Sequence, residues 1–60
     1  QDIVKLVASG NLTPEQLVQI RIGIEKKLTD NQLINLINNN VPADQMKEII
    51  EIAVLENSMQ

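Results

Sequence analysis

Carboxylates are the side chains of this chain that could do acid–base or metal chemistry. The sequence contains no His and no Cys, so imidazole and thiolate chemistry are excluded. Asp44, Glu48 and Glu51 are spaced to share one face of a helix, where their oxygens could hold a divalent cation or meet a basic partner. A row of carboxylates on a helix is usually solvated surface, and we expect that here. Lys47 is spaced to pair with Glu51.

Other reactive groups are few and isolated. Ser9 and Ser58 lie near expected helix ends, and the two glycines form no phosphate-binding loop. Arg21 could contact a ligand, but we expect it to cover the edge of the core near Glu25. Gly23 lies inside an expected helix, which predicts the close approach of a neighbouring helix. We therefore expect no enzyme activity, no catalytic residue, no cofactor and no metal site.

Composition excludes further classes of function. The 60 residues include no Phe, Tyr or Trp, so platforms for base stacking and aromatic interface anchors are missing. The net charge of −3 opposes attraction to nucleic-acid phosphates. No apolar run approaches the roughly 20 residues of a membrane span. The absence of Cys fits a reducing compartment, and we expect a cytoplasmic location.

The sequence nearly repeats itself. Residues 3–20 align with residues 33–49 when Asn11 is dropped, and nearly all apolar positions coincide. Such a self-match is typical of repeat architectures, whose units cannot bury their apolar faces alone. We expect one helical domain with repeat one at about 1–28 and repeat two at about 29–60. The chain starts at Gln1 within a helical pattern, so we expect it to be a fragment of a longer protein.

Three helix starts are visible in the sequence. The pattern L-T-x-x-Q-L occurs from Leu12 and from Leu28, and a variant with Pro42 in place of Thr occurs from Val41. Thr followed by Gln three residues later is a capping box, and the flanking apolar residues form a hydrophobic staple. The pattern predicts helices over about 2–9, 14–27, 30–38 and 43–56, with Gly10 and the run of three asparagines at 38–40 ending the first and third.

The expected core is aliphatic. Helical spacing places one set of apolar residues on the inward faces of the two long helices. These are Leu17, Ile20, Ile24 and Leu28 in the first half, and Met46, Ile49, Ile50 and Ala53 in the second.

Both long helices carry a second apolar stripe. Val18 and Ile22 lie away from the expected core face of one helix, and Ile52, Leu55 and Met59 lie nearly opposite that of the other. Helices with two apolar sides in so small a domain indicate a surface that another protein or a second copy covers. These five residues are the candidate interface.

A helix-turn-helix is the alternative interpretation of about residues 28–50. The segment reads as helix, short Asn-rich turn and helix, with Val41 in the turn. A recognition helix needs cations and amides towards DNA. Here the exposed face carries Asp44, Glu48 and Glu51 with only Lys47, so nucleic-acid binding is disfavoured.

Residues 16–28 resemble a recurring helical repeat, written loosely Q-M-x-x-I-R-x-G-L-E-x-G-L, found in uncharacterised proteins of Gram-positive bacteria and their mobile elements. Six positions match it: Gln16, Ile20, Arg21, Gly23, Glu25 and Leu28. Lys27 replaces the second Gly, and the copy from Gln45 has Ile50 for the Arg and Ile52 for the Gly. The resemblance implies a bacterial protein and no established activity.

The sequence thus predicts an all-α fold of four short helices, arranged as two tandem αα-hairpin repeats in a small bundle. The expected role is that of a non-catalytic protein-interaction or structural repeat module that binds a protein partner or itself, with no membrane segment.

Overall fold

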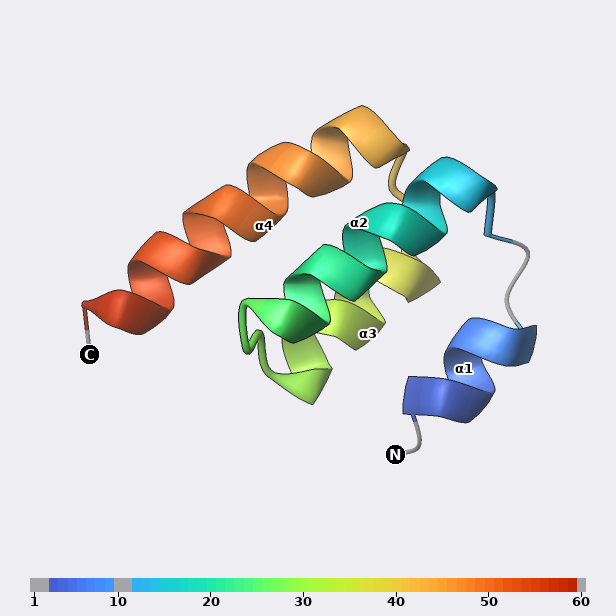
Figure 1. Cartoon of the computed structure of the whole chain (residues 1–60), viewed down its shortest axis with the longest axis horizontal. Helices are drawn as coiled ribbons and strands as arrows, with labels where there is room; N and C mark the ends of the chain where they lie inside the picture. The colour runs from blue at the N-terminus through green and yellow to red at the C-terminus, as the bar shows by residue number, and fades with distance from the viewer. Residues whose placement is uncertain (1–2, 10–11, 60) are drawn as a thin grey trace.

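The computed structural model describes residues 3–9 and 12–59, and these residues form four α-helices and no strand (Figure 1). Helix α1 spans Ile3–Ser9, α2 Pro14–Glu25, α3 Asp30–Asn38 and α4 Ala43–Ser58. The predicted all-α class with four short helices is confirmed. The expected helix start at Asp2, the helix end at Gly10 and the extra residue Asn11 lie outside the described residues.

Capping boxes start α2 and α3, as the sequence predicts. The Thr13 hydroxyl accepts from the backbone N–H of Gln16 at 3.1 Å, and the Gln16 side chain accepts from the backbone N–H of Thr13 at 2.8 Å. Thr29 and Gln32 repeat this exchange at 3.2 and 2.9 Å. Each box satisfies two backbone donors that a helix start otherwise leaves unpaired. Pro42 precedes α4 and provides no side-chain cap.

Both α2 and α3 end in a Schellman motif. The Leu28 N–H donates to the Gly23 carbonyl and the Lys27 N–H to the Ile24 carbonyl, so the last carbonyls of α2 are satisfied. The same pair of bonds closes α3, with Asn40 in the equivalent position to Lys27. Lys27 and Asn40 have φ values of 66° and 51°. The expected left-handed asparagine is confirmed, whereas Lys27 adopts this conformation without the small polar side chain that favours it.

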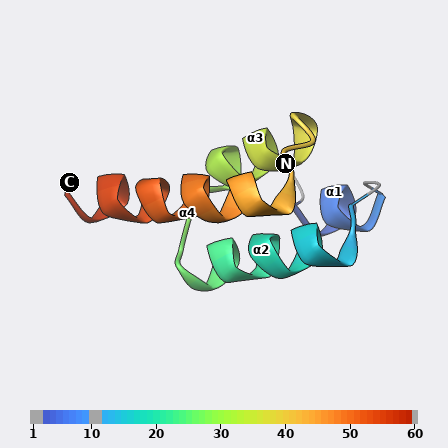
Figure 2. The same ribbon diagram turned by 90° about the horizontal axis from the view of Figure 1, so that it is seen from above.

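The helices pack in a bundle in which the most extensive contacts join helices that are not consecutive in the chain. Contacts are most extensive between α2 and α4 and between α1 and α3, and α2 also packs against α3. Figures 1 and 2 show α2 and α4 running side by side in the same direction, with α3 running in the opposite direction. The C-terminal end of α4 extends beyond the end of α2 in both views.

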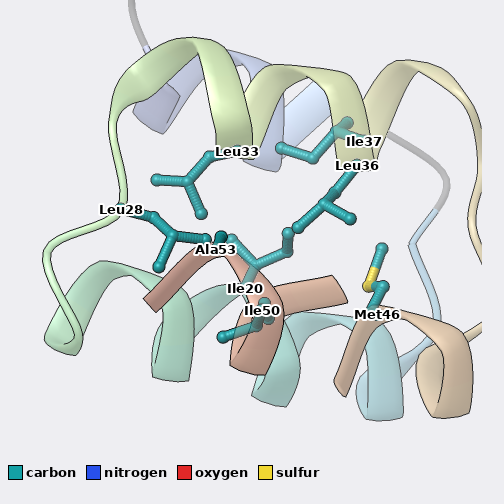
Figure 3. Packing of buried hydrophobic residues seen from close by; sticks show 8 residues of the cluster. All are labelled: Ile20, Leu28, Leu33, Leu36, Ile37, Met46, Ile50 and Ala53. Atoms are coloured by element: carbon teal, nitrogen blue, oxygen red, sulfur yellow. The ribbon is translucent and has the colours of Figure 1, made fainter. Parts of the chain in front are cut away.

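One aliphatic cluster lies between α2, α3 and α4 (Figure 3). Its buried members are Ile20, Leu28, Leu33, Leu36, Ile37, Met46, Ile50 and Ala53. Gly23 is buried beside this cluster, and a Cβ at this position would lie 2.9 Å from Cδ2 of Leu33. The expected close approach of a neighbouring helix at Gly23 is therefore confirmed, and α3 is that helix.

Three residues expected in the core are exposed instead. Leu17, Ile24 and Ile49 are 40%, 51% and 41% exposed, so the prediction for them is wrong. The buried side chains of α2 are those of Gln16 and Ile20, with Gly23 one turn further. Residues four and seven apart lie on one helical face, and Leu17 and Ile24 fall on its flank.

The polar side chain of Gln16 occupies a buried position on this face of α2. It is 6% exposed, and its Nε2 donates to the backbone carbonyl of Val41 at 2.7 Å. Gln16 also completes the capping box of α2. The alignment of the repeats pairs Leu17 with Met46, yet Met46 is fully buried, so the two long helices bury their faces in registers that differ by one residue.

Candidate functional site

The exposed apolar side chains of α4 form the main candidate surface. Ile52, Leu55 and Met59 are 56%, 63% and 83% exposed. On α2, Val18 is 54% exposed, whereas Ile22 is half-buried and packs against the core cluster. The structure therefore leaves four of the five candidate interface residues largely in solvent, and Ile22 is shared between core and surface.

A groove of about 500 Å³ runs between α2 and α4, and we call it the α2–α4 groove. Its walls are mainly aliphatic, with Ile22 from α2 and Val54 and Leu55 from α4. Lys26 and Lys47 line it from opposite helices, and Glu51 is the acidic residue in its wall. The groove thus combines an apolar surface with a net positive charge.

The two lysines of the groove have no acidic partner in the described part of the chain. The ion pair found there joins Arg21 to Glu25, with Nε and Oε2 3.7 Å apart and both side chains largely exposed. The expected contact of Arg21 with Glu25 is confirmed, and the expected Lys47–Glu51 pair is not formed. An exposed pair of this kind adds at most about 1 kcal/mol to stability.

A second groove of about 360 Å³ lies on the other side of α4, against α3. Ile49, Ile52 and Glu56 line it from α4, and Gln32 and Asn35 from α3. The apolar stripe of α4 therefore continues from this groove across the outer side of the helix to Leu55. No cation lines this second groove.

Two glutamines tie the helices together, a role that the sequence analysis missed. Gln32 exchanges two hydrogen bonds with Asn57, from its Nε2 to Oδ1 at 3.1 Å and from the Asn57 Nδ2 to its Oε1 at 3.0 Å. Gln16 makes its corresponding contact with Val41. Each partner lies 25 residues further along the chain. The sequence signal for this role was that both glutamines belong to identical capping boxes and have a partner at the same distance along the chain.

The carboxylates of α4 form no metal site. No three acidic residues in the described ranges, 3–9 and 12–59, lie close enough together to hold a metal ion. Asp44, Glu48 and Glu51 are all exposed, and Asp44 accepts a hydrogen bond from the backbone N–H of Gln45 at 3.0 Å. Their arrangement can attract a basic partner surface.

The helix-turn-helix outline exists in the structure as α3, a turn through Asn40 and Val41, and α4. Val41 is half-buried against the core, as a turn residue of such a motif would be. Contacts between α3 and α4 are less extensive than those of α2 with α4. The side chains that would face DNA include Asp44 and Glu48 beside Lys47, all exposed, so this face would bring carboxylates towards phosphates.

None of the helices in the described parts is both long and apolar enough to cross a membrane. No family model matches the chain, and neither a curated protein nor a solved structure matches it.

Proposed function

We propose that this chain is a non-catalytic helical module that joins proteins, and that the exposed stripe of α4 is its contact surface. The observation that carries the proposal is the exposure of Ile52, Leu55 and Met59 on one side of a helix whose other side buries Met46, Ile50 and Ala53. Contiguous exposed apolar side chains rimmed by polar residues mark interaction surfaces in soluble proteins.

The size of the core supports the same role. Among the residues whose burial the structure describes, eight apolar side chains are buried in the bundle and seven large ones are exposed. A chain of 60 residues buries only about 60% of its unfolded surface and is marginally stable. Covering the exposed residues with a partner would add burial that the isolated chain lacks, at roughly 25 cal/mol per Å² of apolar surface.

Site-specific photo-crosslinking in cells that naturally produce the protein tests this role. A photoreactive amino acid at position 55 should yield a covalent adduct with a protein. The matched position 38 is exposed at the C-terminal end of α3, away from the apolar stripe, and should yield none. If neither position, nor position 52 or 59, gives a protein adduct, the proposal is wrong.

DNA binding is the second candidate, and the outline of α3, turn and α4 is the observation in its favour. The four acidic residues of α4, at positions 44, 48, 51 and 56, oppose it, because they would repel the phosphate backbone. Fluorescence anisotropy with a labelled random duplex at low salt should show no binding. Salt-dependent binding at micromolar concentration would favour the DNA-binding role instead.

A further inference from the structure

We propose that the chain assembles head to tail with copies of itself, the outer face of α4 in one copy docking into the α2–α4 groove of the next. The inference rests on the proposed interaction role and names the partner. It follows from the charges and apolar side chains of two surfaces that lie on opposite sides of α4.

The docking face of α4 is acidic and apolar. We call it the acidic face and define it by Glu48, Ile49, Ile52, Glu56 and Met59, all of which are exposed, although its inner edge also lines the second groove, against α3. Their positions fall within about 100° of arc on a helix of 3.6 residues per turn. The one cation of α4, Lys47, lies in the wall of the α2–α4 groove instead. The acidic face therefore carries two carboxylates with no cation beside them on the helix.

The receiving surface has the complementary charge. Lys26 and Lys47 flank the aliphatic wall of the α2–α4 groove, and neither has a carboxylate partner in the described part of the chain. A helix with two acidic residues and an apolar stripe would place its carboxylates near these ammonium groups and its apolar residues over Ile22 and Leu55. Such complementarity sets partner choice and register at an interface.

The charges and the positions of the two surfaces together decide the symmetry of the contact. Two acidic faces brought together would oppose carboxylates to carboxylates, and like-charge contacts of this kind suppress association. The acidic face therefore needs a different, basic surface as its partner. Because the two surfaces lie on opposite sides of α4, one copy can use both at once. A contact between different surfaces continues into an open row unless the rotation closes a ring.

The solvent-accessible area of the chain is larger than that expected for a monomer of its mass. A monomer of this mass is expected to expose about 3,900 Å², whereas this chain exposes 4446 Å². A standard interface removes about 800 Å² from each partner, and the continuous stripe from Ile49 to Met59 together with the groove provides apolar surface for it.

A charge-reversal pair in sedimentation velocity tests the proposal. Wild type should form a series of species beyond the dimer as its concentration rises from micromolar to millimolar. The groove variant Lys26→Glu/Lys47→Glu and the face variant Glu48→Lys/Glu56→Lys should each be monomeric over this range. An equimolar mixture of the two should regain assembly, because each variant then supplies the charge that the other needs. The control Glu15→Lys/Glu25→Lys has the same change in net charge as the face variant and should assemble like wild type.

Several results would overturn the proposal. These are a wild type that is monomeric throughout, assembly that stops at a dimer, variants that associate as wild type does, and a mixture that stays monomeric. Circular dichroism verifies that each variant is helical. If a variant fails to fold, the salt dependence of wild-type assembly tests the proposal instead. Added salt should weaken an association guided by these charges, and assembly that does not change with salt would contradict it. A monomeric wild type that still gives an adduct with another protein from position 55 would refute self-assembly and leave the interaction role intact.

Discussion

At the scale of single residues, the three helix starts after Thr13, Thr29 and Pro42 share one backbone conformation and differ in side-chain chemistry. The φ and ψ angles are −72° and 161° at Thr13, −71° and 159° at Thr29, and −59° and 152° at Pro42. Proline has no hydroxyl to accept from the third residue of the helix. The backbone at position 42 already suits a capping threonine, and Gln45 stands where the second half of a capping box belongs.

These caps predict two substitutions of opposite effect. Thr13→Ala should lower the free energy of unfolding by about 1 kcal/mol, because the Gln16 N–H loses its acceptor. Pro42→Thr should raise the free energy of unfolding by roughly 0.5 kcal/mol. The new capping box stabilises the folded state by more than the loss of proline stabilises the unfolded chain. Urea unfolding followed by circular dichroism measures both. An unchanged stability in Thr13→Ala would mean that this cap contributes nothing.

The left-handed residue Lys27 predicts a stabilising substitution. A non-glycine residue in this conformation lowers the stability of the folded chain by about 1–2 kcal/mol. Replacing it with glycine removes this strain, but glycine also stabilises the unfolded chain through its greater conformational freedom, so the net gain is smaller. Lys27→Gly should therefore raise the free energy of unfolding by about 0.5–1 kcal/mol. Asn40→Gly is the matched control and should change it less, because asparagine tolerates the left-handed region. Equal effects at the two positions in urea unfolding would contradict the argument.

At the scale of elements, two glutamines that start helices also fasten those helices to distant parts of the chain. Gln16 holds the start of α2 against the turn before α4, and Gln32 holds the start of α3 against the end of α4. Both contacts are partly buried, but Gln16 itself is buried whereas Gln32 is half-buried. A buried polar group that loses its partner costs more than an exposed one, because water cannot replace the bond.

The two glutamines therefore predict unequal costs for the same substitution. Gln16→Leu should lower the free energy of unfolding by about 2 kcal/mol, since the Val41 carbonyl and the Thr13 N–H lose their partner in a partly buried setting. Gln32→Leu removes the same capping box at a more exposed site and should cost about 1 kcal/mol. Thermal unfolding compares the two. A larger loss in Gln32→Leu would show that burial does not decide the difference.

At the scale of the whole molecule, the described part of the chain leaves seven large apolar side chains exposed beside a core of eight buried ones. The core is built on Met46, Ile50 and Ala53 of α4, and the opposite side of the same helix holds the exposed stripe. Because α4 is packed on one side, a partner that covers its other side would add to the stability of the fold. Stability and association should therefore be linked, because whatever binds the folded state alone stabilises it.

This linkage predicts a melting temperature that rises with protein concentration. Leu55→Asp should keep the helical circular-dichroism signal, because Leu55 is 63% exposed, and its melting temperature should not depend on concentration. Ile50→Asp is the control within the core and should unfold the chain, since a carboxylate would be buried without a partner. Loss of helical signal in Leu55→Asp would instead place Leu55 in the core. Differential scanning calorimetry at several concentrations measures the dependence.

The four helices could be predicted from the sequence, although α2 ends at Glu25 rather than at about Lys27 and α4 at Ser58 rather than at about Glu56. Cap, staple and proline signals act over a few residues, so the starts of α2 and α3 and the left-handed Asn40 could be predicted from local chemistry alone. The opposition between Met46 and the stripe of Ile52, Leu55 and Met59 follows from helical periodicity within α4, and it too was predictable. The sequence also predicted hairpins of consecutive helices, whereas the most extensive contacts join α2 to α4 and α1 to α3.

The buried side of α2 and the grouping of the surface charges could not be predicted from the sequence. Leu17 and Ile24 are as apolar as Ile20, yet they are exposed while Gln16, bonded to a carbonyl 25 residues away, is buried. Lys26 follows the end of α2 and Lys47 lies in α4, and only the packing of α2 on α4 brings them into one groove. Local sequence does not specify such contacts, because they depend on the relative rotation of whole helices.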